Sequence, residues 1–164
     1  MKSTILCLIV MITLGFTGCA KKSYEVERSQ LAAYTDRLEF IQKSVAVGVF
    51  FGNNVSDAMY FQDVVLDSLS VVKNELAKLT MPEDSTIKIH HILLSASEVA
   101  TLSCRAFQRG LTIASQIPRG MFRYVNSWDN AEFKSAWRLR DSATVMIKIA
   151  DSLLYRRSSS KSKQ

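Results

Sequence analysis

Two adjacent histidines, His90 and His91, are the first residues whose types suggest chemistry, because imidazole binds metals and transfers protons near neutral pH. The stretch around them has helical periodicity, so the two rings project about 100° apart and cannot share one metal ion. Ligands on a single helix must lie three or four residues apart. The residues at that spacing from the pair are poor ligands: Thr86, Ile87, Leu93, Leu94 and Ser95. We therefore expect no metal site here, but one buried, hydrogen-bonded histidine and one surface histidine.

The other residues that catalysis or cofactor binding would need are missing from the sequence. It contains no Gly-x-Ser-x-Gly elbow, no phosphate-binding glycine loop and no Cys-x-x-Cys-His haem motif. A di-iron bundle requires Glu-x-x-His, and neither Glu83 nor Glu98 has a histidine three residues later. We expect no catalytic residue, no metal and no cofactor. A non-covalent haem held by one histidine and a methionine remains an alternative.

Cationic and aromatic residues alternate in the C-terminal part of the chain, in a composition that favours a binding surface. The members of this predicted face are Arg119, Arg123, Tyr124, Trp128 and Trp137. Arginine, tyrosine and tryptophan are the residue types that most often anchor interfaces, and arginine also stacks on aromatic rings. The alternative interpretation is that the aromatic rings cover a hydrophobic core and the arginines surround them.

The first nineteen residues have the pattern of an export signal. Lys2 precedes an apolar run, Ile5 to Phe16, that is shorter than the roughly 20 residues a membrane-spanning helix needs. The segment Phe16-Thr17-Gly18-Cys19 resembles the lipobox of bacterial lipoproteins, with Phe16 where the motif usually has an aliphatic residue. The resemblance implies that Cys19 is acylated, becomes the first mature residue and anchors the protein to a bacterial membrane, facing the periplasm.

Two alternatives to lipidation remain open at the N-terminus. Lys21 and Lys22 follow Cys19 directly, and positive charge beyond an apolar segment opposes translocation of that end. The segment could therefore be an uncleaved anchor, or a signal that is cleaved without lipidation. If Cys19 is lipidated and Cys7 is removed with the signal, Cys104 is the one cysteine left in the folded part. Its place in a helical apolar pattern predicts a small buried side chain.

Charge is divided unevenly along the chain. Residues 23–104 contain eleven acidic and six basic residues, whereas residues 105–164 contain four acidic and twelve basic ones. A basic half is typical of proteins that bind nucleic acid or anionic lipid. However, an exported protein rarely meets nucleic acid, and an acidic half packed on a basic half cancels much of the field. We expect no nucleic-acid partner, and an envelope protein or an anionic surface as the possible partners.

Apolar residues after the signal recur in steps of three and four, which predicts four amphipathic helices. The first stripe consists of Leu31, Tyr34, Leu38, Ile41 and Val45. The second consists of Ala58, Gln62, Val65, Leu69, Val72, Leu76 and Leu79. The third consists of Ile89, Leu93, Ala96, Ala100, Ser103 and Phe107. The fourth consists of Phe133, Ala136, Leu139, Ala143, Met146, Ala150 and Leu153.

Helix-breaking residues separate these stripes. Residues 52–54 (Gly-Asn-Asn) favour a turn, and Pro82 fits the first turn of the third helix. That helix is expected to end at Gly110 or, at the latest, before Pro118, because the residue preceding a proline is pushed out of helical conformation. Asp129 is the expected cap of the fourth helix.

Four amphipathic helices with short connections predict an all-α fold, an antiparallel up-down four-helix bundle. The expected organisation is a signal peptide (1–18), a lipidated tether (19–28), the bundle (29–155) and a disordered basic tail (156–164). The stretch Leu76–Leu94 loosely resembles small helical lipoproteins of bacteria, which implies a helical bundle and no specific chemistry.

These observations predict a membrane-anchored envelope lipoprotein with a non-catalytic structural or protein-interaction role. One alternative is a bundle that binds a small apolar or haem-like ligand, lined by Tyr34, Phe50, Phe51, Phe107 or Met146. The other is an immunity or exclusion lipoprotein of a mobile element, which fits the same size and location.

Overall fold

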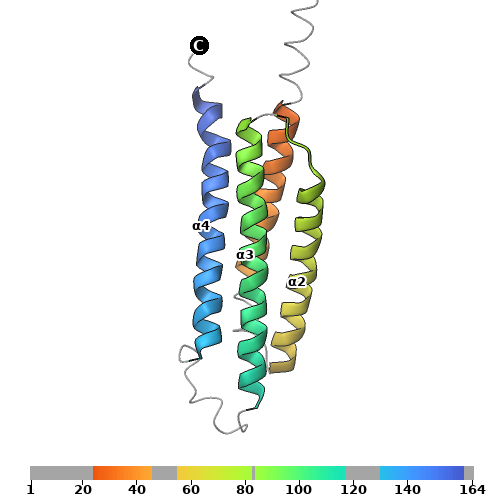
Figure 1. The fold of residues 1–164 in the computed structure, drawn as a ribbon, viewed down its shortest axis with the longest axis vertical. Coiled ribbons are helices and arrows are strands. Elements are labelled where there is room, and N and C mark those ends of the chain that lie inside the picture. Colours follow the sequence, from red (N-terminus) through yellow and green to blue (C-terminus); the bar gives the residue numbers. More distant parts are fainter. Residues whose placement is uncertain (1–23, 46–54, 83, 117–129, 161–164) are drawn as a thin grey trace, which may run out of the picture.

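A computed structural model describes residues 24–45, 55–82, 84–116 and 130–160, with side chains up to residue 155 in the last range. The described residues form four helices and contain no strand (Figure 1). They are helix 24–45, α2 (Val55–Lys78), α3 (Asp84–Ser115) and α4 (Ala131–Ser160). The all-α prediction is confirmed.

Each helix runs antiparallel to its neighbour in sequence. Between helix 24–45 and α2, Arg37 pairs with Glu75, and the Gln62 amide donates to the carbonyl of Val45 at 3.1 Å. Residue numbers thus rise along one helix as they fall along the other. The same opposed numbering relates α2 to α3 through the pairs Lys73–Glu98 and Asp63–Gln108, and α3 to α4 through Ser103–Ala136 and Gly110–Asn130. The predicted up-down bundle is therefore correct.

Helix 24–45 closes the bundle by packing against both α2 and α4. Arg37 of this helix pairs with Glu75 of α2, and Arg140 of α4 donates from Nε to the carbonyl of Gln42 at 3.5 Å. Thr86 of α3 also donates to the Glu27 carboxylate, at 3.1 Å. The third helix, α3, packs against both α2 and α4. Figure 1 accordingly shows α3 between α2 and α4, so that α2 and α4 lie diagonally opposite each other in the bundle.

The hydrophobic core lies along the four predicted stripes, with two changes of register. On helix 24–45 and α4, some predicted positions are only half-buried and their neighbours point inward instead. Thr35 is buried beside half-buried Tyr34, and its hydroxyl donates to the carbonyl of Leu31 at 2.8 Å. The innermost positions of α4 are Phe133, Ala136, Ala143, Ile147, Ala150 and Leu154. The buried positions near the C-terminal end of α4 are thus Ile147 and Leu154, each one residue after the predicted Met146 and Leu153. The shift arises because the 3.6-residue turn of an α-helix does not match a seven-residue repeat, so the buried face moves around the helix along its length.

Gly110 does not end the third helix, contrary to one of the two expected ends, since α3 continues to Ser115. The Phe133 ring of α4 packs directly on this glycine. A Cβ atom at residue 110 would lie 2.9 Å from Phe133 Cδ1 and 2.9 Å from Cε1. Because Gly110 has no side chain, the Phe133 ring can lie directly on the backbone of α3, and α4 begins close to α3.

The two ends of α4 also differ from expectation. Asn130 caps its N-terminus, with Oδ1 accepting from the Glu132 N–H at 2.8 Å, while the predicted cap Asp129 lies outside the described residues. At the other end, α4 continues to Ser160, beyond the boundary at residue 155 where a disordered tail was expected. Residues 156 and 157 are arginines, and arginine has a high helix propensity, which is compatible with this extension.

Candidate functional site

The predicted binding face is placed only in part. Arg119, Arg123, Tyr124 and Trp128 lie outside the described residues, as does Cys19. Trp137 is half-buried and meets the Phe107 ring edge-on, with 5.1 Å between the ring centroids. It therefore covers the core, as the alternative interpretation of these aromatic residues had it.

The guanidinium of Arg140 lies over the Trp137 ring, with Cζ 5.2 Å from its centroid. Arg140 also donates to the carbonyl of Gln42 on helix 24–45. Arg140 thus joins α4 to the neighbouring helix while it lies over the Trp137 ring.

The pair meets the expectation in part: His90 is hydrogen-bonded but half-buried rather than buried, and His91 lies on the surface. Nε2 of His90 lies 2.7 Å from the carbonyl oxygen of Leu76, so it carries the proton and donates across the α2–α3 interface. His91 is exposed, and its ring centroid lies 5.8 Å from that of His90. Among the described residues, no group of three or more histidine, cysteine or acidic side chains could hold a metal ion.

Cys104 is fully buried in the core on α3, and this burial raises the pKa of its thiol to about 12. A neutral, enclosed thiol is a poor nucleophile. Its role is to fill space between the helices.

We expect Cys104 to resist thiol reagents at about pH 8 in the folded protein and to react fully after unfolding. The unfolded thiol ionises near its ordinary pKa of 9.0, whereas the folded one stays neutral until about 12. The raised thiol pKa of Cys104 therefore adds to the free energy of unfolding in full below pH 9.0, and this contribution is lost as the pH rises to about 12. Urea unfolding across this pH range measures it, and Cys104→Ala should show a smaller loss. Rapid labelling of the folded protein would contradict the burial.

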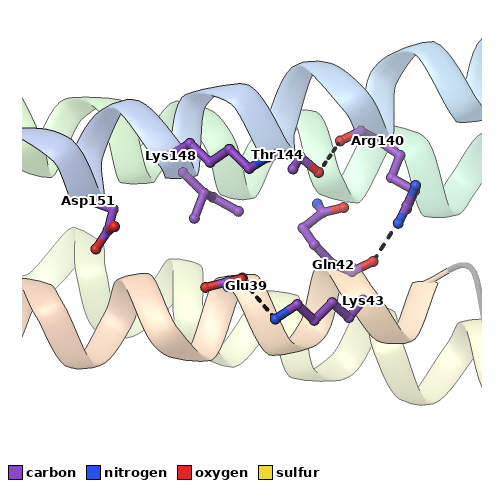
Figure 2. A pocket seen from close by; sticks show the side chains of 8 residues that line it. Glu39, Gln42, Lys43, Arg140, Thr144, Lys148 and Asp151 are labelled. Carbon is purple, nitrogen blue, oxygen red and sulfur yellow. Dashed lines mark hydrogen bonds and ion pairs between the residues drawn. The ribbon is translucent and has the colours of Figure 1, made fainter.

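A cleft of about 410 Å³ lies between helix 24–45 and α4 (Figure 2). We call it the α4 groove, and it is lined by Glu39, Gln42, Lys43, Arg140, Thr144, Ile147, Lys148 and Asp151. Its volume falls within the range of about 300–1,000 Å³ that is typical of small-molecule sites. Apart from Arg140, which belongs to the alternation of cationic and aromatic residues around Trp137, none of these residues was singled out as a binding residue from the sequence.

Gln42 is the unusual residue of the α4 groove. Its side chain is 3% exposed, and neither Nε2 nor Oε1 has a hydrogen-bond partner among the described residues. Figure 2 shows the amide lying between the two helices, beside Thr144 and Arg140. A buried amide without partners is costly, because it loses its hydrogen bonds to water and gains none in return.

Charged side chains surround this amide. Lys43 and Glu39 form an exposed ion pair of 2.8 Å along helix 24–45. The Lys43 hydrogen bond, then its charge, and to a smaller extent the charge of Lys148, lower the pKa of the Glu39 carboxyl. With Arg140 and Asp151, the groove holds three cations and two carboxylates.

A second surface feature lies on the opposite side of helix 24–45, toward α2. Phe40, Tyr60, Val64 and Val71 are 72%, 71%, 45% and 49% exposed, and we call them the outer apolar stripe. Phe40 and Val71 line a shallow groove of about 510 Å³ between the two helices. Tyr60, Val64 and Val71 recur at helical spacing on the face of α2 that points away from the core. This spacing is visible in the sequence, but the core residues of α2 form a longer and more regular apolar stripe.

Five ion pairs between described residues each lie within one half of the chain. These pairs are Arg37–Glu75, Lys43–Glu39, Lys73–Glu98, Arg109–Glu132 and Arg140–Asp141. Between the halves, the charge of Lys148 lowers the pKa of the Glu39 carboxyl, an attraction of the kind expected from the charge distribution.

Comparison of the chain with protein-family models, curated proteins and solved structures gives no match. Within the described ranges, none of the helices has the length and apolar character needed to cross a membrane.

Proposed function

We propose that the protein is a lipid-anchored lipoprotein of the bacterial envelope whose helical bundle acts without catalysis, by contact with another envelope protein. The membrane anchor rests on the sequence Phe16-Thr17-Gly18-Cys19 after an apolar run. The contact role rests on the outer apolar stripe. Two acyl chains hold a protein on a membrane stably, since each buried methylene contributes about 0.8 kcal/mol.

The outer apolar stripe is the observation that carries the contact role. Phe40 and Tyr60 are large aromatic side chains with more than two thirds of their surface exposed. Exposed apolar groups that gather on one face mark sites of protein contact, and polar groups at the edge of such a face add specificity. Asp36 and Arg37 line the same shallow groove and supply such polar groups.

Replacing Cys19 tests the anchor. We expect Cys19→Ser to abolish lipidation and to move the protein from the detergent phase to the aqueous phase on phase partitioning. Intact-mass measurement of the unaltered protein should show a chain that begins at Cys19 and carries acyl groups. Cys7→Ser is the matched control and should leave mass and partition unchanged, because residue 7 is removed with the signal. Normal processing and partition of Cys19→Ser would disprove the anchor.

Site-specific photocrosslinking tests the contact role. With a photoreactive amino acid at residue 40, we expect one envelope protein to be crosslinked in living cells and identified by mass spectrometry. A reciprocal crosslink from that protein should recover this chain. The control position is Lys88, which is exposed on α3. Equal products from residues 40 and 88, or no product from residue 40, would contradict a contact at the stripe.

A further inference from the structure

The α4 groove combines two features that an ordinary helix interface lacks. Gln42 presents a hydrogen-bond donor and an acceptor that are both buried and without partners among the described residues. The cleft beside it is open and has a volume of about 410 Å³. Each amide atom has less than 1 Å² of accessible surface, so a molecule in the cleft satisfies both atoms once the Gln42 side chain turns toward it.

The donor and acceptor of Gln42 restrict the chemistry of such a molecule. A secondary amide also carries one donor and one acceptor, so it can form two hydrogen bonds with the Gln42 amide. The dianion of a phosphate monoester offers acceptors only, so Oε1 of Gln42 would stay unpaired. The amide pairing therefore favours an acylated amino acid or a peptide over a phosphate.

The charges of the groove add a second restriction. Lys43, Arg140 and Lys148 attract an anionic group, whereas Glu39 and Asp151 repel multiply charged anions. Lys43 pairs with Glu39, and Arg140 pairs with Asp141 at 3.6 Å. Lys148 is then the one lining cation outside these pairs, so the groove suits a single negative charge. Ile147 supplies apolar contact for a small side chain.

We propose that the α4 groove is a binding site for an N-acylated amino acid or short peptide with a free carboxylate. Gln42 pairs with the ligand amide, and Lys148, helped by Lys43 and Arg140, binds the carboxylate. This site lies on α4 and is separate from the outer apolar stripe, so it is independent of the contact role proposed above.

The test uses full-length protein in detergent micelles with N-acetyl-alanyl-alanine as the probe. The matched control probe is N-acetyl-alanyl-alanine amide, which keeps the peptide groups and removes the charge. Glutamine-selective nitrogen-15 labelling reports on Gln42 directly. Gln62 is an internal control, because it is fully buried but donates to the Val45 carbonyl and does not line the groove.

We expect the free acid to shift the Gln42 side-chain amide signal saturably, with a Kd in about the millimolar range, and to leave Gln62 unshifted. The amidated probe and Lys148→Gln should each weaken binding about tenfold. Lys88→Gln, a charge change at an exposed position on α3, should leave the affinity unchanged. Gln42→Met should abolish binding without loss of helical circular dichroism.

Several results would overturn the proposal. One is the absence of a saturable Gln42 shift up to about 10 mM acid. Another is equal affinity for the acid and the amide, which would remove the role of the cations. A third is unchanged binding by Gln42→Met. Because Lys148 is exposed, Lys148→Gln keeps the proposal testable even if Gln42→Met fails to fold.

Discussion

Replacing Phe107 with alanine is expected to destabilise the folded protein by about 3–5 kcal/mol. Phe107 is completely buried, with its ring centroid 6.1 Å from that of Phe133 and 5.1 Å from that of Trp137. The substitution removes a large apolar side chain and leaves a cavity between α3 and α4 that rigid aromatic neighbours cannot fill. This is a large share of the 5–15 kcal/mol by which domains are typically stable.

Urea unfolding followed by far-ultraviolet circular dichroism measures this loss. Phe40→Ala is the matched control, because the same side chain is removed from a position that is 72% exposed. We expect that control to change stability by less than about 0.5 kcal/mol. Similar losses from the two substitutions would mean that the Phe107 ring is not the centre of the core.

The second large effect is expected at Gly110, where leucine should destabilise the protein by about 2 kcal/mol net. Leucine is the better helix former by nearly 1 kcal/mol, but overpacking at this contact costs about 3 kcal/mol. The cost arises because a Cβ atom already lies 2.9 Å from the Phe133 ring, so that ring must move. If helix propensity alone decided the outcome, Gly110→Leu would stabilise α3. A measured loss of stability would therefore show that the contact with the Phe133 ring outweighs helix propensity.

A double-mutant cycle attributes the loss to Phe133. In a Phe133→Ala background the ring is absent, and Gly110→Leu should become neutral or stabilising by about 1 kcal/mol. The two substitutions should therefore couple by about 2–3 kcal/mol, as judged from urea unfolding of all four proteins. Additive effects would show that Gly110 is needed for a reason other than the Phe133 ring.

Helix positions could be predicted from sequence because burial follows helical periodicity. All six residues predicted for the third stripe, including Leu93 and Phe107, are buried. The glycine was harder to interpret. Gly110 indicates a helix end when considered alone, and only the Phe133 ring shows why a glycine stands inside α3.

The candidate ligand site could not be predicted, because its residues come from helices about a hundred residues apart. Lys43 and Lys148 are ordinary surface lysines in the sequence. One signal was available in retrospect: Leu38, Gln42 and Val45 recur at core spacing, with a polar residue in the middle. That pattern predicts a buried glutamine but does not tell what it faces.

The sequence by itself determined the helical secondary structure, most residues of the core and the expectation of a lipid anchor, because these depend on local spacing and residue type. Tertiary structure alone decided which side chains of neighbouring helices meet. It thereby placed the Gln42 amide against α4 without a partner among the described residues, and left Phe40 exposed beside α2. The physical reason is that hydrogen bonding and exposure depend on the surfaces that meet in space, which helical periodicity within one segment does not specify.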